Sequence, residues 1–463
     1  SLMSVVVIWI AINAFQPLSE LMLGYDEVDY MQAAKPQADD IYLGKSTLNF
    51  IDFAKLGYQK IKGGDSLSLG VHETKDSFIL RHFHGVLPVY FIKLFQGGGE
   101  DSVGIQKVAW EVKLSSIVIF AISFLFLTLF YSNNFPSFLA SLAVSALFLT
   151  TPIAMEPFYD LNFHTFLALA IVPFALVFNK VISDPDSKNS ILLFIILGMM
   201  VNIIVTATFV IFGVALILYL SGNFKKVVTI PSLSAFAATI FLTYPGQLLS
   251  LDYVKAHLMH AYKIFVYKKE YTSVSMNSVY EDIQTSLPFI LVLCAIFVYR
   301  TYFRKIKTSF KNDALLYLGI VFIVLNSPFL LNIRYFLPGI TILAVWAIKE
   351  AGLSFDTVQF NNKQALRLFL LSLAVMLVVN YSAVSKSAVS RYLEESKYSS
   401  LFRADIIDLK NSINFDSNNS LIISDIAHML TFYIGSNNFV HGYIAKDTVL
   451  VRMNRKMFPI DAF

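Results

Sequence analysis

A long apolar run occupies residues 108–131, VAWEVKLSSIVIFAISFLFLTLFY. It is longer than the roughly 20 apolar residues that an α-helix needs to cross the hydrocarbon core of a bilayer. Comparable apolar runs lie at about residues 2–19, 136–155, 161–180, 190–220, 227–249, 284–300, 313–331, 335–349 and 367–385. The sequence therefore predicts an α-helical polytopic membrane protein.

The composition indicates the same class. Of 463 residues, 56% are hydrophobic and only 15% are charged, whereas about a quarter of the residues in soluble domains are charged. This excludes a soluble enzyme. The single cysteine, Cys294, excludes an intramolecular disulfide and a multi-cysteine metal site. We expect membrane lipids, and no nucleic acid, among the partners.

The run at residues 190–220 determines the predicted topology. It is too long for one comfortable crossing but suits two short helices that meet near Asn202 or Thr206. Two helices give about eleven spans, and the basic loops at 225–226, 300–311 and 349–367 then share one side. By the positive-inside rule, that side is the cytoplasm. One helix would place the densest basic loop, TYFRKIKTSFK, outside, so we predict two.

Three large polar segments then share the outer face: 20–107, 250–283 and everything after about 386. This favours an outward-facing active site. The first segment contains SFILRHFHGVLPVYFIKLF, whose basic and aromatic residues suit an interfacial helix. In the last, LIISD, IAHMLTFYIG, NNFVHGYI and DTVLVRM predict strand, helix, strand and strand. We predict a transmembrane domain at residues 1–385 and a small extracytoplasmic α/β domain at 386–463, which the natural chain could extend.

Acidic residues follow the first span in GYDEVDYMQ, where Asp26 and Glu27 stand at the predicted outer boundary of the membrane. One interpretation is a pair of solvated loop residues, the commoner fate of isolated acidic side chains. The other is a general base, because partial desolvation near the hydrocarbon edge favours proton abstraction. Both interpretations stay open from the residues alone.

A second acidic turn occurs in MEPFYDLNFHTFLALA. Asp160 could simply cap a helix that starts at Leu161. Alternatively, it could face Asp26 across a cavity, with His164 helping to orient an acceptor or to hold a metal ion. One carboxylate from each of two loops is too little to predict a metal site.

Two further segments combine basic and aromatic residues. Arg81, His82 and His84 lie close together in RHFHG, and Arg334 and Tyr335 begin RYFLPG. Interfacial cations that snorkel toward water are one interpretation of both. The other is recognition of a phosphate at headgroup depth, which suits the planar fork of arginine. Arg334 stands at the outer end of an apolar helix, where an ionisable residue indicates binding of a partner or substrate.

Several motifs of well-known chemistry are absent. The sequence contains no G-x-x-x-x-G-K-[ST], no G-x-G-x-x-G between strand and helix, no H-E-x-x-H and no G-x-S-x-G. ATP-driven transport and the usual hydrolase mechanisms therefore lose support.

The segments containing YDE, RHFHGVLPVYFIKLF, YDLNFHTFLALA and RYFLPG, in that order, resemble the GT-C superfamily of integral membrane glycosyltransferases. The resemblance is closest to the branch of protein O-mannosyltransferases and lipid A aminoarabinose transferases, and covers roughly residues 1–385. Many relatives have His-Pro-Pro-Leu where this chain has His84-Gly85-Val86-Leu87. The Trp-Trp-Asp-Tyr-Gly signature of oligosaccharyltransferases is missing, which disfavours en bloc glycan transfer to asparagine.

The resemblance implies a GT-C-like fold and a sugar donor on polyprenyl phosphate, which would be undecaprenyl phosphate in a bacterium. It implies transfer to a glycan, lipid or protein acceptor on the extracytoplasmic side of a plasma membrane, with inversion and with Asp26 as general base. Glu27 and Asp160 would shape the acceptor pocket. The remaining substrate-binding residues would be Arg81, His82, His84, His164, Arg334 and Tyr335. Arg334 would stabilise charge on the leaving phosphate.

Two rival functions stay open. A lipid-linked sugar flippase or transporter would place ionisable residues near span centres and break its helices in repeated positions. A glycan polymerase or ligase with a diphosphate-linked donor would use the Arg81 segment but would leave Asp26 without a role. The sequence leaves the sugar, the acceptor, the oligomeric state and the need for a divalent cation undetermined.

Overall fold

The computed structural model describes residues 85–96, 102–204, 206–244, 286–326 and 333–355, with residues 27, 30, 31, 34 and 382 and two short strands at 422–424 and 439–441. The chain forms two compact units. The first unit comprises Ser1–Glu20, Trp110–Ile240 and Tyr267–Leu393. The second unit comprises Leu21–Ala109, Phe241–Val266 and Glu394–Phe463. Each unit is described by itself below.

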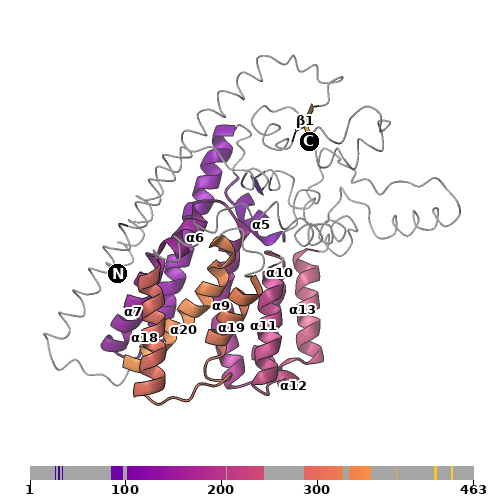
Figure 1. Ribbon diagram of the computed structural model, residues 1–463. Helices are drawn as coiled ribbons and strands as arrows, with labels where there is room; N and C mark the ends of the chain where they lie inside the picture. The colour runs from indigo at the N-terminus through magenta and orange to yellow at the C-terminus, as the bar shows by residue number, and fades with distance from the viewer. Residues whose placement is uncertain are drawn as a thin grey trace, which may run out of the picture. The chain divides into compact units, whose positions relative to one another are not determined.

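The first unit is a bundle of helices that run beside one another (Figure 1). In chain order, its described elements are α6 (Ser102–Phe130, in this unit from Trp110), α7 (Phe135–Leu149), α8 (Pro152–Met155), η3 (Glu156–Phe158), α9 (Phe163–Ser183), α10 (Ser187–Val201), α11 (Ala207–Leu220), α12 (Phe224–Val227), α13 (Ile230–Thr243, in this unit to Ile240), α18 (Leu287–Val298), the π-helical turn η4 (Tyr299–Phe303), α19 (Ala314–Asn326), η6 (Ile333–Tyr335) and α20 (Leu337–Phe355).

Three of these described helices are long and apolar enough to cross a membrane: Lys107–Phe130, Phe163–Ser183 and Leu337–Ser354. Six shorter apolar helices accompany them: Phe135–Leu149, Ser187–Val201, Ala207–Leu220, Ile230–Thr243, Leu287–Tyr302 and Ala314–Asn326. The protein is therefore an integral membrane protein, as its apolar runs predict. The predicted spans at 2–19 and 367–385 fall outside the described residues, apart from residue 382.

The long apolar run at 190–220 is divided into α10 and α11, as the distribution of basic loops favours. α10 ends at Val201 and α11 begins at Ala207. The side-chain amide of the buried Asn202 donates a hydrogen bond to the carbonyl of Ile240 in α13, at 3.2 Å. A polar side chain at the break thus satisfies a neighbouring backbone group while the helix is interrupted.

α20 lies at the centre of the bundle and packs against α7, α9 and α19. Small residues permit this packing. A side chain at Gly319 would meet Leu343 and the carbonyl of Gly339, so α19 and α20 approach closely at this pair of glycines. On the α7 side, Ser141 Oγ donates to the carbonyl of Ile348 at 3.1 Å. Close backbone approach and interhelical hydrogen bonds hold helices together where lipid supplies no hydrophobic driving force.

Aromatic packing joins α6, α7 and η3. Phe120 of α6 contacts Phe124, Phe148 and Phe158, with ring centroids 5.0, 6.1 and 5.1 Å away. All four rings are at most 1% exposed. Since Phe158 is the last residue of η3, this cluster fixes the connection between α7 and α9 against the bundle.

The second unit contains α5 (Leu87–Lys93), within the segment predicted as an interfacial helix. It also contains β1 (Ile422–Ser424) and β2 (Phe439–His441), which pair in parallel with Ile422 opposite Phe439. The two strands confirm the strands predicted in LIISD and NNFVHGYI. The helix predicted between them and the strand predicted in DTVLVRM lie outside the described residues, so the α/β domain stays a prediction.

Candidate functional site

Asn162 organises the connection between α7 and α9. Its side-chain oxygen accepts a hydrogen bond from the backbone N–H of Thr165 at 3.2 Å, which makes it the N-cap of α9. Its side-chain nitrogen donates to the carbonyl of Pro157 and, at 3.3 Å, to the carbonyl of Asp160. One buried side chain therefore fixes both the turn that carries Asp160 and the first turn of α9.

The turn η6 packs against η3 and the start of α9. Phe336 follows η6 directly and is buried against Ile153 of α8, with Ile323 and Ile340 packed around them. This apolar contact holds the chain on both sides of Phe336 in place. Arg334 and Tyr335 are thereby positioned beside the first residues of α9.

His164, Tyr335 and Arg334 form the candidate site, which we call the His164 cluster. His164 is the second residue of α9 and is only 4% exposed. Its ring centroid lies 4.4 Å from that of Tyr335, with an interplanar angle of 59°. The guanidinium carbon of Arg334 lies 5.8 Å from the Tyr335 ring centroid, within the range of a cation–π contact.

The electrostatics of the His164 cluster favour an anion. Arg334 carries a permanent positive charge and is close enough to His164 to interact with it electrostatically. The N-terminus of α9, a helix of 21 residues, adds backbone N–H groups and the positive end of a helix dipole. Arg334 and Tyr335 are half-buried, whereas the His164 imidazole is buried. A phosphate or carboxylate would find a cation, donors and a helix N-terminus together here.

Asp160 lies half-buried in the connection before α9, four residues before His164. The interpretation that it caps a helix beginning at Leu161 is wrong, because α9 begins at Phe163 and Asn162 is its cap. Asp160 instead lies in the turn before α9, and its backbone carbonyl accepts a hydrogen bond from the Asn162 side chain. Its carboxylate therefore remains a candidate for acceptor binding.

Glu27 belongs to the second unit and is buried, at 5% exposed. The helical residues around it are tied to the end of α5. Lys93 Nζ donates to the carbonyl of Ala34 at 3.1 Å, and the Gln96 side chain donates to the carbonyl of Met31 at 3.3 Å. Met31 and Ala34, which follow Glu27 in the chain, are thus linked by hydrogen bonds to the end of α5. Burial argues against Glu27 being an ordinary solvated loop residue.

Four predicted site residues lie outside the described residues: Asp26, Arg81, His82 and His84. Their roles stay predictions. Within the described part of the chain, no three His, Cys, Asp or Glu side chains are arranged to hold a metal ion. The question of a divalent cation therefore stays open.

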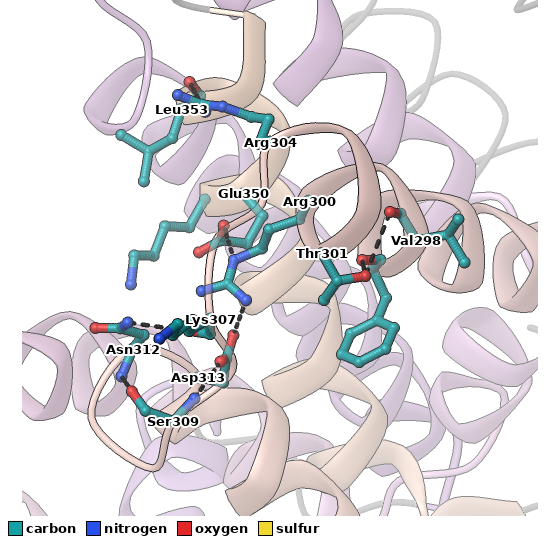
Figure 2. A network of polar contacts seen from close by, with 12 residues as sticks. Val298, Arg300, Thr301, Arg304, Lys307, Ser309, Asn312, Asp313, Glu350 and Leu353 are labelled. Atoms are coloured by element: carbon teal, nitrogen blue, oxygen red, sulfur yellow. Dashed lines mark hydrogen bonds and ion pairs between the residues drawn. The ribbon is translucent and has the colours of Figure 1, made fainter.

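A second polar centre, the Arg300 cluster, consists of Arg300, Asp313 and Glu350 (Figure 2). Arg300 Nη1 lies 2.7 Å from Asp313 Oδ1, and Arg300 Nε lies 2.8 Å from Glu350 Oε2. The three residues are 2%, 0% and 4% exposed. Arg300 comes from η4, Asp313 directly precedes α19, and Glu350 lies in α20, so the cluster joins three elements.

Polar contacts continue from the Arg300 cluster toward α9. Lys349, next to Glu350, donates to the side-chain oxygen of Asn179 at 3.4 Å. The Asn179 amide nitrogen donates in turn to the hydroxyl of Tyr131 at 3.2 Å. Buried ions in this arrangement are paired, which is the usual requirement inside a membrane protein.

Two sets of residues were missed by reasoning from the sequence alone. The role of Asn162 could have been predicted, because asparagine directly before an apolar helical run is a common N-cap residue. The Arg300 cluster offered a weaker signal. Arg300 was counted among the basic loop residues, and nothing in the spacing of Arg300, Asp313 and Glu350 indicates that they meet.

Comparison with known proteins identifies a related fold. No protein-family model matches the chain, and no curated protein sequence matches it. The structure is similar to the crystal structure of ArnT from Cupriavidus metallidurans bound to undecaprenyl phosphate, with a TM-score of 0.54 and 12% sequence identity. The likeness covers 93% of this chain and 84% of that chain. The chain therefore has a GT-C-like membrane fold, as its motif order predicts.

Proposed function

We propose that this chain is a glycosyltransferase that moves a sugar from a polyprenyl-phosphate donor to an acceptor on the outer face of the membrane. The observation that carries the proposal is the fold. The chain matches, over 93% of its length, a solved structure that holds undecaprenyl phosphate. The order of the four motif segments supports the same branch of glycosyltransferases, and the His164 cluster offers an anion site within the bundle.

In this proposal, Arg334 binds the phosphate of the donor. A guanidinium is suited to phosphate oxygens, and its pairing with the Tyr335 ring restricts its orientation. Negative charge on the phosphate increases as the bond to the sugar breaks. A cation already in place stabilises that charge without reorganisation during the reaction.

The proposed reaction is a single displacement with inversion. A hydroxyl or amine of the acceptor attacks the anomeric carbon, and its proton passes to the Asp26 carboxylate. The bond between the anomeric carbon and the phosphate oxygen breaks, and the electron pair leaves with polyprenyl phosphate. A phosphate leaving group needs little protonation, so no separate acid is required. Glu27 and Asp160 shape the acceptor pocket.

The proposal is tested by incubating the purified full chain with a panel of polyprenyl-phosphate sugars and membrane extract. Free polyprenyl phosphate is followed by mass spectrometry. We expect release by the wild type, no release by Asp26→Asn, and a higher donor concentration at half-maximal rate for Arg334→Ala. All three proteins should unfold at nearly the same temperature.

Each result bears on a different part of the proposal. A fully active Asp26→Asn enzyme would remove Asp26 as the base. An unchanged donor dependence in Arg334→Ala would remove Arg334 from the donor site. If no donor is consumed and the protein instead moves lipid-linked sugars across vesicle membranes, the transferase proposal is refuted in favour of a flippase.

A further inference from the structure

His164 presents a buried polar atom that nothing in the described structure satisfies. Its Nε2 atom is buried and has no hydrogen-bond partner among the described residues. Leaving a buried donor or acceptor unpaired costs roughly 1–3 kcal/mol. Buried polar groups are usually paired in native proteins, so an unpaired one needs an explanation, and the surroundings of the atom decide whether a ligand supplies it.

The surroundings of His164 restrict what that partner is. The Tyr335 ring lies against the imidazole at a centroid distance of 4.4 Å, and the guanidinium carbon of Arg334 lies 5.8 Å from the centroid of the Tyr335 ring. The imidazole stands in the first turn of α9, where backbone N–H groups and the helix dipole favour negative charge. A neutral hydroxyl would gain little from this cation and this dipole. A ligand oxygen that carries negative charge would gain from both.

We propose that His164 is a ligand-binding residue whose Nε2–H donates a hydrogen bond to the phosphate of the polyprenyl-phosphate donor. This rests on the proposed function and deepens it, since His164 is assigned to the donor phosphate rather than to the acceptor. Arg334 supplies charge to the anion, and His164 supplies a directed hydrogen bond from a buried position. An imidazole suits that position because it can donate without carrying a charge.

The alternative role for His164 is structural: its ring would only pack against the Tyr335 ring and would bind no ligand. Two substitutions separate the roles. His164→Phe keeps an aromatic ring against Tyr335 but removes the nitrogen. His164→Gln loses the ring but places an amide N–H near the position of Nε2. If the hydrogen bond matters, the glutamine variant binds the phosphate better than the phenylalanine variant, and packing predicts the reverse.

Trp346 provides a matched control. It is 1% exposed in α20, and its Nε1 atom is likewise buried without a hydrogen-bond partner among the described residues. Its ring lies near Phe297 of α18, with centroids 6.5 Å apart, away from η6. Trp346→Phe therefore removes an orphaned donor from the bundle without touching the His164 cluster.

Binding is measured on the purified full chain in lipid nanodiscs with undecaprenyl phosphate, with undecaprenol, and with inorganic phosphate as competitor. We expect His164→Phe to weaken undecaprenyl phosphate binding roughly ten- to a hundredfold, the range for a hydrogen bond to a charged group. His164→Gln should recover most of that loss, and Trp346→Phe should bind like the wild type. Affinity for undecaprenol should be the same in all four proteins.

The phenylalanine variant should also unfold at the same temperature as the unliganded wild type or above it, because an unsatisfied polar atom has been removed. Wild-type affinity in His164→Phe would overturn the inference, and so would equal losses for undecaprenyl phosphate and undecaprenol. Displacement of the lipid by inorganic phosphate at comparable concentration would show a site for free anions instead. Wild-type protein that fails to bind undecaprenyl phosphate would refute the proposed donor itself, and this inference with it.

Discussion

Replacement of Arg300 by methionine should destabilise the bundle by about 3–5 kcal/mol, the cost of breaking a buried ion pair from one side. Methionine retains an unbranched apolar stem but has no charge. The two carboxylates that remain, on Asp313 and Glu350, lie 2.7 and 2.8 Å from the guanidinium in the wild type. Both residues stay buried in the helix bundle, so water does not replace the lost partner.

The expected loss of stability depends more on the burial of the three side chains than on the two ion-pair distances. The residue exposures of Arg300, Asp313 and Glu350 are 2%, 0% and 4%. An exposed ion pair would contribute about 0–1 kcal/mol, and a typical hydrogen bond between membrane helices about 0.6 kcal/mol. Here one substitution leaves two buried charges without the group that paired both, which is the costly case.

Reversible unfolding of purified protein in mixed micelles, followed by tryptophan fluorescence, measures this difference. Arg304→Met is the matched control, because Arg304 is exposed and its side chain, among the described residues, donates one hydrogen bond, from Nη1 to the carbonyl of Leu353 at 2.7 Å. That control should lose less than about 1 kcal/mol. The triple variant Arg300→Met, Asp313→Asn, Glu350→Gln should recover most of the stability that Arg300→Met loses, because none of the three side chains then carries a charge.

Two outcomes would refute this reasoning. If Arg300→Met costs no more than Arg304→Met, the Arg300 cluster is not a buried ion pair in the folded protein. If the triple variant is as unstable as Arg300→Met, the loss comes from shape and hydrogen bonding, and the unpaired charges do not explain it.

Other predictions concern close packing and the connection before α9. Gly352→Ala should lower stability by about 1–3 kcal/mol in the same unfolding assay, because its methyl group would press into the carbonyl of Tyr131. Gly213→Ala should lose clearly less, because its methyl group would press on the flexible end of Leu318 and make only an ordinary contact with Val321. Asn162→Ala and Asn134→Ala each remove a helix N-cap and should each cost about 1–2 kcal/mol, but only the first should weaken undecaprenyl phosphate binding. Equal binding by both cap variants would show that the connection before α9 does not position the site.

Most helices of the bundle could be predicted because length and hydropathy alone define them. The long run at 190–220 is the clearest example, since its excess length and the basic loops predicted a break near Asn202 that the structure contains. The boundaries were less accurate. The helix predicted from Leu161 begins at Phe163, because Asn162 takes the cap. The hydrogen bonds of the Asn162 side chain set the start of α9, and hydropathy carries no information about such hydrogen bonds.

The candidate site could be predicted only in part. The sequence indicated Arg334 because an ionisable residue is rare at the end of an apolar run, and His164 because it follows the acidic turn that carries Asp160. Their contact through Tyr335 depends on how η6 packs against α9, and Phe336 fixes that packing by burial against Ile153. Such contacts between distant segments are tertiary, so the order of residues in the sequence does not contain them.

The two polar centres lie toward opposite ends of α20, and this allows stability and binding to be separated. Tyr335 lies two residues before Leu337, the first residue of α20, and Glu350 lies about 20 Å along the helix at 1.5 Å per residue. Loss of Arg300 frees α20 near its C-terminal end, whereas Phe336 still anchors the N-terminal end. The fraction of Arg300→Met that stays folded should therefore bind undecaprenyl phosphate with wild-type affinity. His164→Phe should show the opposite pattern, with intact stability and weakened binding. The Arg300 cluster would then stabilise the bundle, and the His164 cluster would bind the ligand.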